Sequence, residues 1–310
     1  MRPPVDGPRF RIVTGKGGVG KTTVATALAI AECARGRRTL LAEANGHGQV
    51  AAVLGLPPVG SEIREVRKGL CLVDLNPRDA MREYARLVFK LEALVHAVFD
   101  NRVVQRFLAL IPSLGELVML GKLWFHEQET KNDRPRFDVI VLDAPATGHA
   151  LAMLRAPALV ERAVPPGPLR EITRDLQQLL TDATRTRLHV VTTPEEMPIT
   201  EALEIEHTAS ETLRVALGTL FINQRLRQVP SAAMERLRSV GEPNLVALAA
   251  TLRLREQRRA RGEELLARLP ADRLRTATSL PRFFSDHGGR ERVDTLASII
   301  LETLSTGGPS

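Results

Sequence analysis

The chain of 310 residues is 44% hydrophobic and 25% charged, which are the proportions of a globular protein that folds in water. Its length predicts either one large α/β domain with an insertion or two small domains. The net charge is +7, but aromatic residues make up only 4% of the chain and the densest basic stretch, Arg253 to Arg261, contains none, so nucleic-acid binding is not expected.

The first predicted elements are a strand at residues 11–14, a glycine-rich loop, and a helix from about Lys21 to Arg35. The loop and helix start read Gly15-Lys16-Gly17-Gly18-Val19-Gly20-Lys21-Thr22-Thr23, a Walker A pattern in the strand–loop–helix context that binds phosphate. Glycines let successive backbone N–H groups point at an anion, and the helix N-terminus adds partial positive charge. The motif predicts ATP binding, with Lys21 on the β- and γ-phosphates and the Thr22 hydroxyl on Mg²⁺.

Lys16 carries further information, because an ordinary phosphate-binding loop does not require a lysine one residue after its first glycine. With this lysine, the motif resembles the deviant Walker A of the family that contains arsenite-efflux, tail-anchored-protein targeting, septum-placement and plasmid-partition ATPases and the nitrogenase iron protein. In that family the additional lysine typically reaches the partner subunit's nucleotide. The resemblance therefore implies a dimer that sandwiches ATP, and the alternative is a solvated loop lysine.

The second predicted strand, at residues 39–42, runs into Glu43-Ala44-Asn45. In relatives, switch I lies at this carboxyl strand end, and its aspartate positions the attacking water. An ungapped comparison places Asn45 at that aspartate. Asparagine can orient water but cannot accept its proton, so slow turnover is expected. Glu43 is the second candidate for positioning water, and a capping role in the loop is an equally weighted alternative.

Strand patterning stops after a third predicted strand at residues 70–75. Three amphipathic helical stripes follow, and they predict a helical insertion at 77–132 within a single ATPase domain spanning 1–310. In the arsenite and tail-anchored ATPases, which this arrangement resembles, the helical subdomain holds a metalloid site or a client groove. A hydrophobic protein client is one option here, but we favour packing of the stripes on one another, since only Met81 and Met119 supply methionine.

The segment at 137–149 combines an apolar strand with a polar turn. A buried strand that ends in Asp143 is the Walker B arrangement, which places a carboxylate near Mg²⁺. The following run, Asp-Ala-Pro-Ala-Thr-Gly-His at 143–149, closely resembles the Asp-Thr-Ala-Pro-Thr-Gly-His signature of the ArsA-type branch, where it forms switch II. This run distinguishes the arsenite and tail-anchored branch from the partition ATPases.

Further strands are predicted at 188–193, 219–222 and 277–280, with a long helix from about residue 197 to 217 and a helical region at 231–269. In relatives, an asparagine at a strand end reads the adenine edge, which points to Asn223, although such residues are also common in turns. The loop at Pro281 and Phe283 lies where relatives pack a loop on the base. Together these elements predict a doubly wound, mostly parallel α/β sheet of the P-loop NTPase class.

The sequence therefore predicts a Mg²⁺-dependent ATPase that works as a dimeric switch, as a homodimer or as a heterodimer with a paralogue, in the cytoplasm and has no integral membrane segment. Metalloid export, zinc-stapled dimerisation and iron–sulfur chemistry are disfavoured, because the only cysteines are Cys33 and Cys71. Two alternatives stay open. One is a weakly hydrolysing subunit that pairs with an active paralogue as a heterodimer, and the other is a carrier for tail-anchored or other membrane proteins.

Overall fold

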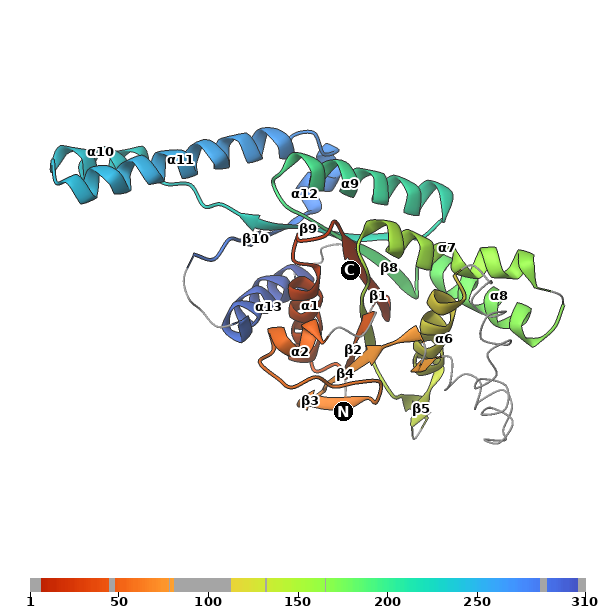
Figure 1. The fold of residues 1–310 in the computed structure, drawn as a ribbon. Coiled ribbons are helices and arrows are strands. Elements are labelled where there is room, and N and C mark those ends of the chain that lie inside the picture. The colour runs from red at the N-terminus through yellow and green to blue at the C-terminus, as the bar shows by residue number, and fades with distance from the viewer. Residues whose placement is uncertain are drawn as a thin grey trace, which may run out of the picture.

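The computed structural model describes residues 7–44, 48–77, 79–80, 113–131, 133–164, 166–284 and 289–305. Two sequence predictions fall outside these residues, namely Asn45 and most of the expected helical insertion, residues 81–112. The elements, labelled as in Figure 1, are β1 (Phe10–Gly15), α1 (Lys21–Ala34), β2 (Thr39–Ala44), α2 (Gln49–Val53), β3 (Arg64–Arg67), β4 (Leu70–Leu75), α6 (Leu114–Gln128), β5 (Thr130–Lys131), β6 (Arg134–Pro135), β7 (Val139–Asp143), α7 (Thr147–Ala163), α8 (Pro168–Thr181), β8 (Thr186–Thr192), α9 (Glu196–His207), the π-helical turn η1 (Thr208–Thr212), β9 (Leu217–Arg225), α10 (Ser231–Ser239), α11 (Pro243–Leu266), α12 (Ala271–Thr276), β10 (Thr278–Pro281) and α13 (Gly289–Ser305).

Eight strands form one sheet in the order β10-β9-β8-β1-β7-β2-β4-β3. Neighbouring strands are parallel except for the edge pair β3 and β4. The chain leaves β1 toward β2 and β4 on one side and later builds β8, β9 and β10 on the other (Figure 1). This is the doubly wound α/β sheet that the sequence predicts. Because the strands are parallel, the carboxyl ends of β1, β2, β7, β8 and β9 lie along one edge.

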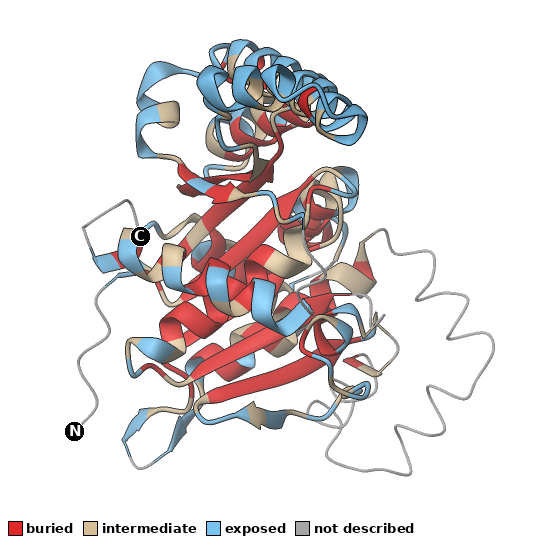
Figure 2. Ribbon diagram, turned by 90° about the vertical axis from the view of Figure 1, so that its left-hand side faces the viewer, coloured by how far each residue is buried: buried red, intermediate tan, exposed pale blue. Residues whose placement is uncertain are grey.

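Helices cover both faces of the sheet. Successive strand residues point to opposite faces, so Ile12 joins a core with α6, α7, α8 and α9, whereas Val13 joins a second core with α1, α2 and α13. Strands that are covered on both faces read as continuous apolar runs, as Val139–Leu142 does. Figure 2 shows the buried residues concentrated in the central strands and on the inner sides of the helices.

The helices α10 and α11 form a hairpin that extends beyond the sheet (Figure 1). None of the residues of α10 is buried, and α11 buries only Ala249 before Gly262, Leu265 and Leu266 near its C-terminal end. The hairpin is therefore anchored through the last turns of α11, and its tip is exposed on most sides (Figure 2).

The predicted strands appear within three residues of the expected ends, but several elements differ from the sequence prediction, and α2, β5, β6 and α12 were not predicted. The edge strand β3 was not predicted, and the helix expected to reach about residue 217 ends at His207, followed by η1. Cys33 lies in α1 and Cys71 in β4. Among the described residues, no helix combines the length and apolar character needed to cross a membrane.

Candidate functional site

The glycine-rich loop joins β1 to α1 at the carboxyl edge of the sheet. Gly18 (φ 86°) and Gly20 (φ 90°) adopt left-handed backbone conformations that favour glycine. One side of the loop is pressed onto β8, where a Cβ on Gly15 would collide with the carbonyl of Val191. The other side is open, because a Cβ on Gly17 or Gly18 would meet nothing within 4 Å. No side chain caps the start of α1, so its first N–H groups face this opening and suit an anion.

Asn223, at the end of β9, ties this loop to the sheet. Its Nδ2 donates to the carbonyl of Val19 at 2.8 Å, and its Oδ1 accepts the backbone N–H of Gln224 at 2.9 Å. The contact is close, since a Cβ on Gly20 would lie 2.5 Å from Nδ2. One further N–H and one further acceptor position of the amide remain for a ligand. Asn223 therefore holds the loop in place. If it also binds the adenine edge, as expected from the sequence, it would do so through the remaining N–H and acceptor position of its side-chain amide.

The two lysines of the loop are held by oxygen atoms of the protein. Lys21 Nζ donates to the carbonyl of Lys16 at 3.1 Å, and burial lowers the pKa of Lys21 against the opposing attraction of Asp143. The Lys16 ammonium forms an ion pair with Glu201 of α9. The other carboxylate oxygen of Glu201 accepts the hydroxyl of Thr147 at 2.9 Å, at the first residue of α7. Glu201 thus joins the loop to the segment that follows Asp143.

Sequence analysis did not identify Glu201. It lies 185 residues after Lys16, within the helix that follows β8. Only the placement of β8 beside β1 brings the start of α9 next to the loop. The hydrogen bond from Lys16 lowers the pKa of Glu201, as expected for an ionised partner of a lysine.

Asp143 ends β7 beside the loop and is only 6% exposed. Its Oδ1 has no hydrogen-bond partner within the described chain. Burial raises the pKa of Asp143 to about 7; the charge of Glu43 also raises this pKa, whereas the hydrogen bond from Thr22 and the charge of Lys21 lower it. The cross-strand register places Glu43 directly beside Asp143. Two carboxyl groups therefore lie together at the sheet edge, and the pKa of Asp143 is raised to about neutral pH.

Glu43 caps the short helix α2. Its two carboxylate oxygens accept the backbone N–H groups of Gln49 at 2.8 Å and of Val50 at 2.9 Å. A carboxylate at a helix N-terminus satisfies unpaired amides and favours the helix dipole. The arrangement matches the capping alternative raised from the sequence, because both oxygens are engaged. The first candidate for positioning water, Asn45, lies outside the described residues.

The oxygen donors at the sheet edge suit Mg²⁺ that arrives with a nucleotide. The described residues hold no group of three His, Cys, Asp or Glu side chains that would bind a metal alone. They do hold Asp143, with an unsatisfied buried oxygen, beside the hydroxyl of Thr22. Mg²⁺ usually takes one or two protein oxygens and completes its shell with phosphates and water. Thr22 and Asp143 therefore fit the metal-binding roles expected for them.

The remaining predicted site residues lie near the same edge. Val19 is buried under the loop, and Thr23 is half-buried in the first turn of α1. Pro281 ends β10, where it pairs with Arg225, two residues beyond Asn223. Phe283 follows and packs against the core on the α1 side of the sheet. The structure thus brings Asn223, Pro281 and Phe283 to neighbouring strand ends, as a base-binding region requires.

Comparison with known proteins agrees with this geometry. The family described as "Anion-transporting ATPase" matches residues 8–165. ATPase BagA of Mycobacterium tuberculosis is 30% identical over 233 residues, which cover 72% of this chain and 66% of that protein. The arsenical pump-driving ATPases of Acidiphilium multivorum and Escherichia coli are 29% and 27% identical over 287 and 285 residues, 85% of this chain and 44% of each relative. The chain thus spans about two thirds of BagA and less than half of the pump ATPases.

The family match covers half of the chain and includes β1, the glycine-rich loop, Asp143 and α7, whereas Glu201, Asn223 and Pro281 lie beyond it. The chain belongs to the anion-transporting ATPase family, the ArsA-type ATPases.

Proposed function

We propose that this chain is a Mg²⁺-dependent ATPase that works as a switch, with its nucleotide at the loop between β1 and α1. The observation that carries the proposal is the open loop beside Asp143, whose Oδ1 has no partner. An open ring of amides, two lysines and a buried carboxyl group is an arrangement that binds a triphosphate together with a metal ion. ATP is the expected substrate, and the names of the relatives are consistent with it.

In this proposal each side chain has a defined task. Lys21 neutralises the β- and γ-phosphates, together with the first amides of α1, and Thr22 and Asp143 hold Mg²⁺. When bound, Mg²⁺ would neutralise phosphate charge and orient the transferred group. Asn223 binds the adenine edge while it braces the loop, and the region of Pro281 and Phe283 packs on the base.

The switch depends on Lys16 and its partner Glu201. In the structure, Glu201 holds both Lys16 and Thr147. The triphosphate competes with Glu201 for Lys16, since both are anions, and the loss of that contact frees one oxygen of the carboxylate that also accepts the hydroxyl of Thr147 at the start of α7. We propose that Lys16 then reaches the nucleotide of a second subunit, so that ATP draws two copies together as a homodimer and hydrolysis separates them.

A second candidate function is a weakly hydrolysing subunit that forms a heterodimer with an active paralogue. The observation that favours it is the capping of α2 by Glu43, which occupies both carboxylate oxygens. With asparagine at position 45, no carboxylate in this segment is then free to orient water. A carrier for hydrophobic clients gains no comparable support, because the apolar side chains Leu117, Val118 and Met119 of α6 are packed in the core.

One experiment separates these functions. ATP binding by calorimetry and phosphate release are measured for the wild-type chain, Lys21→Ala and Asn45→Asp, with Lys131→Ala as a control from the separate two-stranded sheet. An autonomous ATPase turns over alone and loses at least about tenfold in kcat/KM with Lys21→Ala. Binding without turnover, with turnover gained in Asn45→Asp, supports the paralogue-dependent subunit. Absence of ATP binding in the wild-type chain overturns both.

A further inference from the structure

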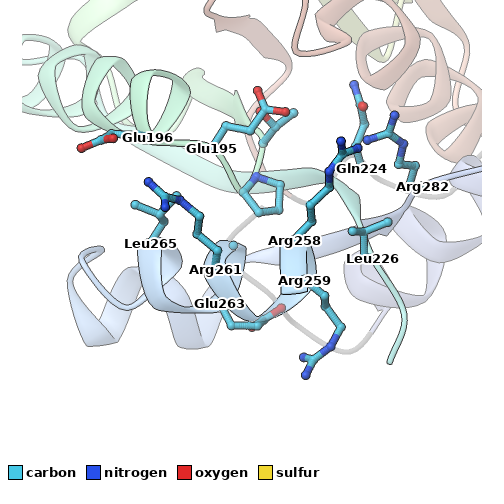
Figure 3. A pocket seen from close by; sticks show the side chains of 13 residues that line it. Glu195, Glu196, Gln224, Leu226, Arg258, Arg259, Arg261, Glu263, Leu265 and Arg282 are labelled. Atoms are coloured by element: carbon cyan, nitrogen blue, oxygen red, sulfur yellow. The ribbon is translucent and has the colours of Figure 1, made fainter. Parts of the chain in front are cut away.

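The outer face of α11 carries a stripe that changes from apolar to basic along the helix. Val246, Ala250, Leu254 and Arg258 recur every four residues and are exposed, and Arg261 follows on the same face. The opposite stripe faces α10, because Leu245, Ala249 and Leu252 are buried or half-buried. Val246 and Leu254 keep 43% and 62% of their surface exposed, so the outer stripe is the face of α11 that is turned away from α10. At its basic end this face is turned toward the sheet, where Gly262 lies against Pro194 (Figure 3).

The basic end of this stripe leads into a pocket of about 320 Å³ between α11, the loop before α9 and the ends of β9 and β10. Figure 3 shows Arg258 of α11 and Arg282 after β10 extending to the same end of the pocket, beside Gln224. Arg261 lines the pocket as well, and Pro194 and Gly262 form part of its wall. The pocket therefore joins the exposed face of the hairpin to the edge of the sheet.

The pocket has an excess of positive charge. Three of its charged lining residues have their charge balanced by an ion pair. The pairs are Glu196 with Arg268, Glu263 with Arg225, and Arg259 with Glu256. Arg258, Arg261 and Arg282 make no ion pair within the described chain, and Glu195 is the single lining carboxylate left to balance them. A carboxylate from outside would be attracted by the uncompensated guanidinium groups, which can bind it bidentately.

We propose that the outer face of α11 and this pocket form a docking surface for an acidic, amphipathic segment of a partner protein. Its apolar side chains lie on Val246, Ala250 and Leu254, and a carboxylate enters the pocket to meet Arg258 and Arg261. Charge complementarity selects the acidic partner, and the four-residue spacing suits a helix that lies along α11. A lipid surface fits less well, because the apolar half of the stripe contains the small residue Ala250 and no aromatic anchor.

The test uses the full chain and a fluorescent synthetic helix with leucine at every fourth position and glutamate elsewhere. A counterpart with lysine in place of glutamate is the matched control peptide. Anisotropy titrations should show binding of the acidic peptide and not of the basic one. Arg258→Glu with Arg261→Glu, or Leu254→Ser alone, should weaken binding at least about tenfold. Arg238→Glu, which reverses an exposed arginine on α10, should leave it unchanged.

Three results would overturn the proposal. The first is equal binding of both peptides, or equal weakening by Arg238→Glu. The second is binding of wild-type protein to phosphatidylglycerol vesicles that Leu254→Ser abolishes, which would identify a lipid surface. The third is a loss of ATP affinity in the Arg258→Glu, Arg261→Glu variant, which would place the pocket in the nucleotide site. The peptide titration is made without nucleotide, so its failure is distinct from failure of the ATPase proposal.

Discussion

If a metal–nucleotide complex binds at Asp143 as proposed, this carboxyl group has to change its protonation state. Burial raises its pKa from the ordinary value of 3.8 to about 7, so between these pH values the folded chain holds a proton there that the unfolded chain has released. Between these two values, the free energy of unfolding falls as pH rises, by up to about 1.4 kcal/mol per pH unit. Above pH about 7 the carboxylate is ionised in both states, and this dependence ends.

We therefore predict that Mg²⁺–ATP binding releases a proton below neutral pH. Only the ionised carboxylate attracts the metal, so the affinity should fall as pH drops below about 7 and level off above it. Calorimetry at pH 6 and pH 8 in buffers of different ionisation enthalpy measures the released proton. In Asp143→Asn the affinity should be lower and its dependence on pH should be only that of the nucleotide itself. An identical pH profile in both proteins would contradict the prediction.

Glu201 offers a second test, because its loss should affect nucleotide binding more than stability. Lys16 and Glu201 keep 26% and 25% of their side-chain surface exposed, and ion pairs of this kind add at most about 1 kcal/mol to stability. Glu201→Gln frees Lys16 from competition with a carboxylate. We predict a several-fold higher ATP affinity and an unchanged urea midpoint. Calorimetry and urea unfolding measure the two quantities.

The matched control for Glu201 lies on the same helix. Glu196 pairs with Arg268 at 3.2 Å, and both side chains are more than half exposed. Glu196→Gln should change neither ATP affinity nor stability. Weaker ATP binding in Glu201→Gln would mean that the carboxylate stabilises the loop in its binding conformation. It would contradict the proposal that Glu201 and the phosphates compete for Lys16.

At the level of elements, hydrophobic patterning predicted where the strands lie in the sequence but not which strands are adjacent in the sheet. The run Leu70–Leu75 is apolar except for Asp74 and was predicted with its observed ends, whereas the charged edge strand Arg64–Arg67 has no apolar pattern that would identify it. The loop at 15–23 was found because its residues are adjacent in sequence. The brace from Asn223 to Val19 spans 204 residues, and only the order of the strands brings these two residues together.

Gly262 shows how closely α11 approaches the loop after β8. A Cβ at this position would lie 2.9 Å from Pro194 Cβ and 3.2 Å from its carbonyl oxygen. We predict that Gly262→Ala destabilises the protein by about 1–3 kcal/mol, because crowding exceeds the gain in helix propensity. Gly121→Ala in α6 is the matched control, since its Cβ would meet nothing within 4 Å, and it should stabilise by up to about 1 kcal/mol. Urea unfolding compares them; equal shifts would contradict the close packing.

Across the whole molecule, the proposed nucleotide site and the proposed docking surface adjoin at the ends of β9 and β10, where Gln224 and Arg282 of the pocket follow Asn223 and Pro281. The loop edge carries Lys16 and the switch segment at Thr147. The α10–α11 hairpin extends beyond the sheet on the side of β10 (Figure 1). A dimer formed through the loop edge would leave the outer face of α11 to a different partner. The extra charge of the chain, +7, is concentrated in arginine, which suits binding to carboxylates through both regions.

If ATP joins two copies of the chain, the mass of the particle should depend on nucleotide and on Lys16. Sedimentation velocity should show a monomer without nucleotide and a dimer with Mg²⁺ and a slowly hydrolysed ATP analogue. Lys16→Ala keeps Lys21 and the loop amides, so it should still bind the analogue but sediment as a monomer. Lys131→Ala removes another lysine and should dimerise as the wild-type protein does. If Lys16→Ala dimerises with the same affinity as the wild-type chain, the role proposed for Lys16 is contradicted. If the wild-type chain binds the analogue yet stays monomeric, pairing with a paralogue is favoured.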